Sequence, residues 1–173
     1  MSNSIKSGLE IERKYIIEMP DRNILMLQKD YTSSSILQIY LPSQNGETHR
    51  IRKRSYSDRV ECTETRKIRL NKMSSHEIEG EISEEEFARL ALNPLPESLP
   101  IEKTRYTFSY CNQIFEIDVY PRWTKTAIME TELDECEREV EIPSFIKIIR
   151  EVTGDKSYSN ASMSRKFPDE EVI

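Results

Sequence analysis

Charged residues recur at every second position along seven separate segments of this chain. In the first segment Glu10, Glu12 and Lys14 alternate with apolar or aromatic neighbours. The other six segments are 49–54, 64–69, 77–82, 103–106, 115–120 and 129–133. Side chains on a β-strand point alternately to opposite faces, so the charges of each segment share one face and the apolar residues share the other. The chain is therefore predicted to be built mainly from strands.

Two architectures accommodate strands of this kind. A single such strand usually belongs to an antiparallel sheet whose charged face meets water. Seven of them form either a flat sheet with charges of both signs over its open face or a closed barrel with the charges inside. In the barrel, the apolar positions point outward and require a cover.

Three segments carry helix signals that would supply this cover. Ser83-Glu84-Glu85-Glu86 is a capping box, and Phe87 follows at helical spacing. Pro143 and Ser144 predict the start of a second helix whose apolar stripe reaches Val152 and which Gly154 closes. A weaker helix signal covers 21–28. We therefore predict an antiparallel α+β fold, a barrel covered outside by amphipathic helices.

Composition excludes several functional classes. The chain has 25 Lys and Arg against 31 Asp and Glu, a net charge of −6, which argues against a nucleic-acid binder. Its four glycines stand alone, so no phosphate-binding glycine loop can be built. The three cysteines, Cys62, Cys111 and Cys136, form no disulfide or zinc pattern, and the two histidines exclude a histidine-rich metal site. Without a signal-peptide pattern or a long apolar run, we expect a soluble, cytoplasmic protein with no membrane partner.

A charged barrel interior would itself be a binding site. Charges removed from water are costly unless they are paired or bind an ion. Carboxylates are the oxygen ligands that Mg²⁺ and Mn²⁺ prefer, and Arg and Lys hold phosphate oxygens. Clusters of both signs in one channel favour a ligand that is a string of phosphates bridged by a divalent metal.

The segment Glu10-Ile11-Glu12-Arg13-Lys14 resembles the ExExK signature of the CYTH domain, the triphosphate tunnel metalloenzyme superfamily. Later segments follow the order of that family: 50–52, 65–67, 77–79, 103–106, 116–120, 130–133 and the C-terminal 152–160. The match spans roughly residues 8 to 162 of a chain treated as one domain, 1–173. The bacterial inorganic tripolyphosphatases are the most similar group.

The resemblance implies a closed eight-stranded antiparallel β-barrel and cleavage of a triphosphate to pyrophosphate and phosphate, dependent on Mg²⁺ or Mn²⁺. The implied metal ligands are Glu10, Glu12, Asp118, Glu130 and Glu132. The implied phosphate-binding residues are Lys14, Arg50, Arg52, Lys67, Lys103 and Arg105. In the tripolyphosphatases a tyrosine in a Gln-x-Tyr-Leu segment accepts a proton together with the signature lysine. Tyr40 and Lys14 occupy these positions and are the implied catalytic residues.

The sequence departs from the family pattern at one point, since Ser75 and His76 stand where many members carry an arginine. It leaves the roles of four residues open: Glu77, Glu79, Glu116 and Lys156. It also leaves open a class IV adenylate cyclase, a thiamine- or nucleoside-triphosphatase, and a non-catalytic binder of polyphosphate. Few aromatics are available to hold a nucleoside, so inorganic triphosphate is the expected substrate. The oligomeric state stays open, a homodimer being one possibility.

Overall fold

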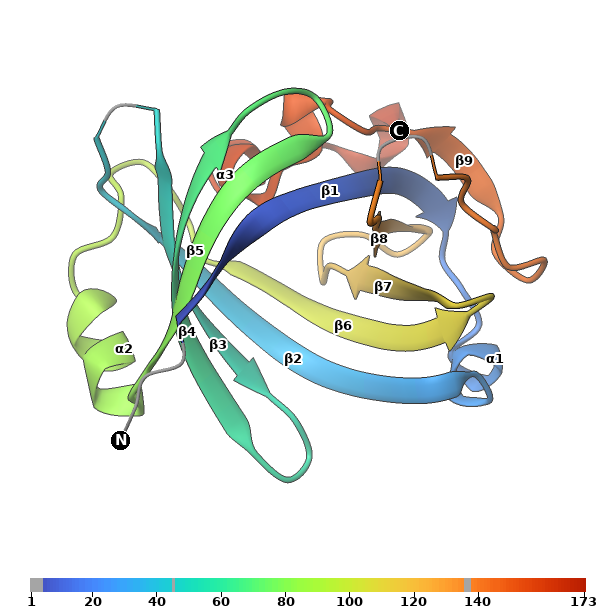
Figure 1. The fold of residues 1–173 in the computed structure, drawn as a ribbon, viewed down its shortest axis with the longest axis horizontal. Helices are drawn as coiled ribbons and strands as arrows, with labels where there is room; N and C mark the ends of the chain where they lie inside the picture. The colour runs from blue at the N-terminus through green and yellow to red at the C-terminus, as the bar shows by residue number, and fades with distance from the viewer. Residues whose placement is uncertain (1–4, 45, 136–137) are drawn as a thin grey trace.

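The computed structural model describes residues 5–44, 46–135 and 138–173. Within these residues it contains a single antiparallel sheet that curves into a barrel (Figure 1). The strands are β1 (Ile5–Glu18), β2 (Lys29–Leu41), β3 (Thr48–Ser55), β4 (Val60–Arg69), β5 (Ser74–Ile82), β6 (Ile101–Tyr110), β7 (Gln113–Val119), β8 (Thr126–Glu132) and β9 (Ile148–Glu151). Their order is β5-β4-β3-β2-β6-β7-β8-β1-β9, and a further pairing of β5 with β1 closes eight of them into a ring. The predicted closed eight-stranded barrel is confirmed, with β9 as an additional strand.

Strand β1 joins the two halves of the barrel. Its first half pairs with β5, so that Glu10 lies opposite Ser75. Its second half pairs with β8, which sets Glu12 opposite Glu132 and Lys14 opposite Glu130. These registers bring the charges of two strands far apart in the sequence to the same place inside the barrel.

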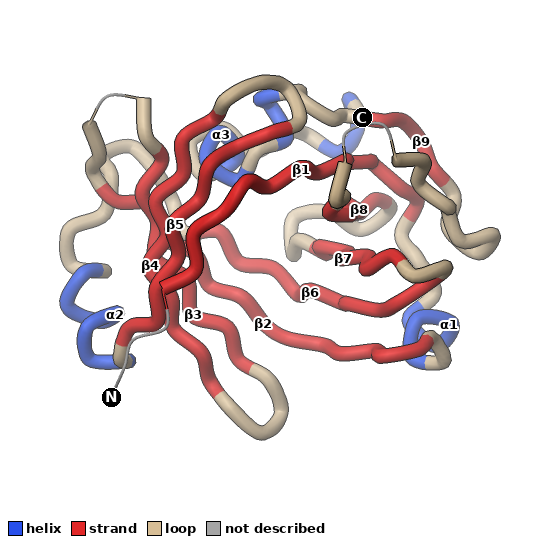
Figure 2. Tube along the Cα trace, in the orientation of Figure 1, coloured by secondary structure: helices blue, strands red, loops and turns tan. Residues whose placement is uncertain are grey.

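Helices form a small part of the outer cover (Figure 2). The predicted capping box is confirmed: Ser83 caps α2 (Glu84–Leu90) by accepting a hydrogen bond from the Glu86 N–H. Phe87 of α2 then packs on Leu41 and Ile51 of the barrel wall. The weaker signal is confirmed by α1 (Arg22–Met26), which Asp21 caps. Two 3₁₀ turns, η1 (Lys156–Tyr158) and η2 (Glu170–Val172), and α3 (Asn160–Met163) complete the helical segments.

The second predicted helix, over 143–152, is wrong. Residues 143–147 form turns and loop, and 148–151 form β9, which pairs with Tyr15–Ile17 of β1. Pairing with β5 ends at Ile11, so this edge of β1 is free to accept β9 further along. The β-branched Ile148 and Ile149 suit that edge better than a helix. Gly154 does adopt a left-handed φ of +81°, but in the loop after β9.

One end of the barrel interior is apolar. Ile16 and Ile128 lie on the same strand faces as Lys14 and Glu130, one step further along, and are fully buried. They pack in a cluster with Tyr40, Ile101, Tyr120, Trp123, Val152, Tyr158 and Met163. The predicted charged interior is therefore confirmed for the rest of the barrel, and this apolar end forms its floor.

Two further features of the described residues are the character of the helices and the state of the cysteines. None of their helices has the length and apolar character needed to span a membrane. Cys62 and Cys111 are free thiols, and Cys136 lies outside the described residues.

Candidate functional site

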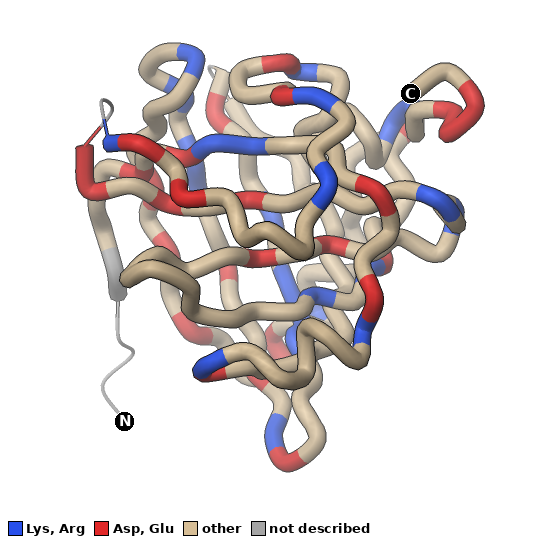
Figure 3. Tube along the Cα trace, turned by 90° about the vertical axis from the view of Figure 1, so that its right-hand side faces the viewer, with Lys and Arg blue, Asp and Glu red and all other residues tan. Residues whose placement is uncertain are grey.

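The charged part of the barrel encloses a cavity of about 510 Å³. All six predicted phosphate-binding residues line it: Lys14, Arg50, Arg52, Lys67, Lys103 and Arg105. Four of the five predicted metal ligands line it as well: Glu10, Glu12, Glu130 and Glu132. Figure 3 shows how positive and negative residues recur along the strands of the barrel. The fifth ligand, Asp118, lies in the wall behind this lining and is fully buried.

Asp118 is the centre of a buried ion-pair network. Its two oxygens accept hydrogen bonds from the Arg105 guanidinium, Nε at 2.6 Å and Nη2 at 2.7 Å, and from Lys103 Nζ at 2.5 Å. Burial alone would raise the pKa of Asp118, but the two cations outweigh burial and lower it. Burial and the neighbouring Arg105 lower the pKa of Lys103 to about 8. Asp118 thus holds two cations at the cavity wall.

Glu130 has a similar environment. Its carboxylate lies 2.8 Å from Lys14 Nζ and 3.0 Å from Arg105 Nη2. Although burial acts against the charged form, Lys14 and Arg105 hold the pKa of Glu130 well below its ordinary value. The same pairing, with a contribution from Glu12, raises the pKa of Lys14 despite its burial.

The opposite wall carries a ladder of ion pairs between β3 and β5. Arg50 lies 3.3 Å from Glu77, and Arg52 lies 3.1 Å from Glu79. Lys67 bridges from Glu77, at 3.2 Å, to Glu10 of β1, at 2.7 Å. Glu77 and Glu79, whose roles the sequence leaves open, are the counter-charges of the arginines.

Four carboxylates gather at one side of the cavity. Glu10, Glu12 and Glu116 pair with Lys67, Lys14 and Arg105, and within the described residues Glu132 has no cation at ion-pair distance. We name the four residues there the acidic rim: Glu10, Glu12, Glu116 and Glu132. Glu132 lies directly opposite Glu12 across the β1–β8 pair. Burial, followed by repulsion from Glu10, Glu116 and Glu12, raises the pKa of Glu132 to about 7.

The acidic rim fits a divalent cation by the chemistry of its donors. Crowded carboxylates that raise one another's pKa are stabilised by a cation, and oxygen ligands of this kind suit Mg²⁺ and Mn²⁺. In the described part of the chain, no three Asp, Glu, His or Cys side chains converge closely enough to hold an ion as they stand. Several carboxylates of the acidic rim are instead paired with lysine or arginine side chains, as Glu10 is with Lys67.

Tyr40 lies at the floor of the cavity, where the charged and apolar parts meet. Its hydroxyl accepts a hydrogen bond from Gln38 Nε2 at 2.7 Å, and both residues are buried. Burial raises the pKa of Tyr40, although Arg50 and Lys14 act in the opposite direction. The pKa values of Tyr40 and Lys14 are both raised, which favours their protonated forms, and their catalytic role stays a prediction.

The described lining of the cavity is poor in aromatic side chains. Among the described residues, Tyr40 is the only aromatic side chain in its lining. Trp123 packs against Tyr120 and Phe167 on the barrel. Tyr106 stacks on Tyr31, and Tyr110 packs edge-on against Phe145.

The sequence marks Ser75 only as a departure from the family pattern and leaves the role of Lys156 open, and it assigns no role to Gln38 or Asn160. Gln38 shares the inward face of β2 with Tyr40, so the period of two could have identified it. Ser75 lines the cavity at the position opposite Glu10, where the family pattern has an arginine. Lys156 and Asn160 reach the cavity from the C-terminal turns, which no strand pattern predicts.

Comparison with known proteins identifies the fold. No family model matches the chain, and no curated protein sequence matches it. The crystal structure of the inorganic triphosphatase NE1496 matches with a TM-score of 0.57 and 25% identity, over 92% of this chain and 96% of that one. The PH1012 protein from Pyrococcus horikoshii OT3 matches with a TM-score of 0.54 and 19% identity, over 74% and 81%. A candidate adenylate cyclase from Bacillus halodurans matches with a TM-score of 0.50 and 18% identity, over 76% and 83%.

The chain therefore has the tunnel fold of the CYTH superfamily, as its sequence motifs indicate. One match that covers nearly the whole of both chains is to an inorganic triphosphatase.

Proposed function

We propose that this protein is a divalent-metal-dependent triphosphatase that hydrolyses inorganic triphosphate to pyrophosphate and phosphate inside the barrel. The observation that carries the proposal is the cavity itself. Within the described residues its lining combines ten Lys and Arg side chains, the six predicted ones among them, with an acidic rim and a single aromatic side chain. Such a site offers charge neutralisation for phosphates and little for a nucleoside. The similarity to an inorganic triphosphatase at 25% identity supports the same reading.

Glu10, Glu12 and Glu132 are the residues proposed to hold the metal, with Glu116 beside them. When bound, the metal would neutralise phosphate charge and activate a water molecule. The choice of these residues rests on the gathering of four carboxylates at the acidic rim, with Glu132 directly opposite Glu12. Burial and the neighbouring carboxylates raise the pKa of Glu132, as expected for a site that a cation would stabilise.

The remaining residues supply positioning and electrostatic stabilisation, the main requirements of phosphoryl transfer. In the substrate-free protein, Lys14 and Arg105 are held by Glu130, while Arg50 and Arg52 are held by glutamates of β5. We propose that phosphate oxygens replace these carboxylates as partners of the cations. The cations then already point into the cavity, and they stabilise charge that develops on the leaving pyrophosphate.

This exchange gives different roles to the two most strongly paired carboxylates. Glu130 lines the cavity, so it can turn to the metal side once phosphate has taken its cations. Asp118 is fully buried behind Lys103 and Arg105, and we propose that it positions these cations instead of binding metal. Tyr40 is proposed to position Arg50, whose charge lies close to its hydroxyl.

The test is a substrate panel at one Mg²⁺ concentration: inorganic triphosphate, ATP and thiamine triphosphate, with phosphate, pyrophosphate and cyclic AMP as readouts. We expect kcat/KM for triphosphate to exceed that for ATP at least about tenfold, a difference of about 1.4 kcal/mol in transition-state binding. Chelator should abolish activity. Glu12→Gln and Glu132→Gln should each lower kcat at least about 100-fold, the loss that even outer residues of a metal site produce.

Lys53→Gln serves as the control, because Lys53 lies on the outer side of β3 and pairs with Glu84 of α2. Comparable rates on ATP would reassign the protein to the nucleoside triphosphatases, and cyclic AMP as the main product would make it a cyclase. Full activity in excess chelator would contradict the metal requirement.

A further inference from the structure

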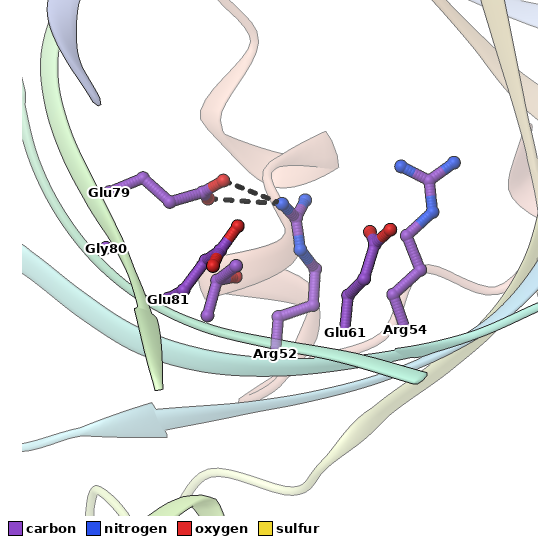
Figure 4. Close-up of a pocket in the computed structure, with 7 residues that line it drawn as sticks. Arg52, Arg54, Glu61, Glu79, Gly80 and Glu81 are labelled. Carbon is purple, nitrogen blue, oxygen red and sulfur yellow. Dashed lines mark hydrogen bonds and ion pairs between the residues drawn. The ribbon is translucent and has the colours of Figure 1, made fainter. Parts of the chain in front are cut away.

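The two ends of the charged interior have different linings. Beyond Arg52, a second cavity of about 210 Å³ adjoins the first, and three glutamates and two arginines line it: Glu61, Glu79, Glu81, Arg52 and Arg54 (Figure 4). This excess of negative charge does not favour an anion. At the other end, the C-terminal turns (residues 154–163) contribute to the lining of the main cavity, while their Tyr158 and Met163 pack in the apolar floor. Polar side chains of these turns therefore lie where the cavity meets its floor.

Asn160 is a polar residue of these turns whose orientation is fixed by a hydrogen bond. The hydroxyl of Tyr120 donates to Asn160 Oδ1 at 2.8 Å. Tyr120 itself is fully buried in the floor. Burial, followed by the charges of Asp118 and Glu130, raises the pKa of Tyr120 well above its ordinary value, so the hydroxyl keeps its proton and stays the donor. The oxygen of the Asn160 side chain therefore faces Tyr120, and its NH₂ group points elsewhere.

The NH₂ group of Asn160 is free to bind another molecule. Within the described residues it donates no hydrogen bond, although Asn160 lines the cavity. The group carries two N–H donors, and donors at an enclosed site normally find acceptors. The negative charge of Asp155 in the same lining is offset, because its carboxylate accepts a hydrogen bond from the Ser157 N–H at 3.0 Å and Lys156 adds a positive charge.

We propose that Asn160 binds a phosphate oxygen of the substrate and that Tyr120 positions it for this contact. The inference rests on the proposed function, because the phosphate is the group of triphosphate nearest the floor. Two predicted phosphate-binding lysines lie next to the pair. Lys103 Nζ is 5.9 Å from the centre of the Tyr120 ring, and the Lys14 N–H donates to Thr153 Oγ1, just before the C-terminal turns, at 3.0 Å. A neutral amide adds a directed hydrogen bond to a charged oxygen without repelling the cations around it.

The experiment measures the dissociation constant of inorganic triphosphate by calorimetry in metal-free buffer, where hydrolysis does not interfere. Asn160→Ala should raise this constant at least about tenfold, since a hydrogen bond to a charged group contributes about this much. Asn160→Asp keeps the shape but replaces the donor with a carboxylate, so it should raise the constant further. Asn93→Asp makes the same charge change at an exposed residue that follows α2, and it should leave the constant unchanged. With Mg²⁺, KM should rise in the same order, and kcat should change less.

Tyr120→Phe tests the positioning role. It should raise the dissociation constant about threefold, because the Asn160 side chain becomes free to rotate. In the Asn160→Ala background the same change should have no further effect, because the group that Tyr120 positions is absent. Equal losses of affinity in both backgrounds would show that Tyr120 acts only through the packing of the floor and would overturn its positioning role.

The contact of Asn160 and the proposed function can fail separately. If triphosphate is bound and hydrolysed but Asn160→Ala leaves affinity and KM unchanged, Asn160 is not a phosphate ligand and the proposed function stands. If the dissociation constants change as expected but Mg²⁺ supports no hydrolysis, the proposed function fails and the phosphate contact of Asn160 stands. An unmodified protein that neither binds nor hydrolyses triphosphate would overturn both.

Discussion

Glu130 and Glu132 are two residues apart on β8 and point to the same side of the strand, yet their environments are opposite. Glu130 faces Lys14 and Arg105, which hold its pKa well below the ordinary value. Glu132 faces the carboxylates of the acidic rim and, with partial desolvation, has a pKa raised to about 7. One step along a strand thus separates a carboxylate held by two cations from one that, within the described residues, has no cation at ion-pair distance. We propose that the paired region binds phosphate and that the acidic rim binds a cation.

The largest effect on stability is expected in the paired region, at Asp118. Asp118→Asn keeps the shape of the side chain but leaves Lys103 without its buried counter-charge and Arg105 with only Glu116 and Glu130. Removing one partner of a buried ion pair costs about 3–5 kcal/mol of unfolding free energy. Denaturant unfolding measures this loss, with Asp134→Asn as the control. Asp134 is an exposed partner of Arg138, so its removal should cost less than about 1 kcal/mol. Equal losses in the two variants would show that the buried ion pairs of Asp118 stabilise the folded protein no more than the exposed ion pair of Asp134.

Arg52 should behave differently from Asp118 although it is also paired and buried. Burial and the neighbouring Arg50 lower the pKa of Arg52, and its partner Glu79 retains a hydrogen bond from Thr65. Arg52→Gln should therefore change the stability of the substrate-free protein little. It should weaken stabilisation of the transition state by about 2–4 kcal/mol, the range for removal of an electrostatic donor. Kinetics and unfolding on the same variant separate the two effects. Wild-type kinetics would place Arg52 outside the phosphate site.

Glu170 lies outside the cavity and, like Glu130, is a carboxylate whose pKa is lowered by its neighbours. The backbone N–H groups of Thr124, Lys125 and Thr126 donate to it at 2.9, 2.6 and 2.8 Å. These bonds outweigh partial burial and lower the pKa of Glu170 to about 2.

Because this folded-state pKa lies below the ordinary value of 4.5, the stabilisation is present above pH 4.5 and is lost as the pH falls toward 2. Glu170→Gln should cost about 1–2 kcal/mol at pH 7 and flatten the acid side of the stability profile. If the variant loses stability at low pH as the unmodified protein does, Glu170 does not contribute to that loss.

The smallest effect, and the only one of opposite sign, is expected at the acidic rim. Glu132→Gln removes one of several repelling carboxylates, so it should raise the stability of the metal-free protein by about 0.5–1 kcal/mol at pH 8. Adding Mg²⁺ should remove this advantage, because only the unmodified rim gains by binding the cation. Thermal unfolding with chelator and with Mg²⁺ provides the comparison. A destabilised variant in chelator would mean that Glu132 is held by donors, as Glu130 is.

The period of two in the sequence predicts the strands and the inward charges, because alternation on a strand is a purely local property. It also predicts the capped helix α2, since Ser83 and Phe87 act within one helical turn. The floor of the barrel could not be predicted this way. Ile16 continues the inward face of Lys14, and only packing with residues distant in the sequence decides that this position is apolar. The error at β9 has the same origin, because Ile148 pairs with an edge of β1 that is free only in the folded barrel.

In the candidate site, too, the sequence predicts some features and only the structure shows others. Lys14, Arg50 and Lys103 could be identified from strand phase and family motif together. Their pairing with particular glutamates depends on strand register, so the separate roles of Asp118 and Glu132 follow only from the structure.

In the proposed function, the acidic rim and not the paired region binds the metal before substrate arrives. The direct test is calorimetric titration of Mn²⁺ into the substrate-free protein and into the two variants Glu132→Gln and Glu130→Gln. Affinity for a divalent cation follows the number of charged ligands that are free to bind it. We predict that Glu132→Gln weakens Mn²⁺ binding at least about tenfold and Glu130→Gln less than about threefold. A loss in Glu130→Gln as large as that in Glu132→Gln would contradict the claim.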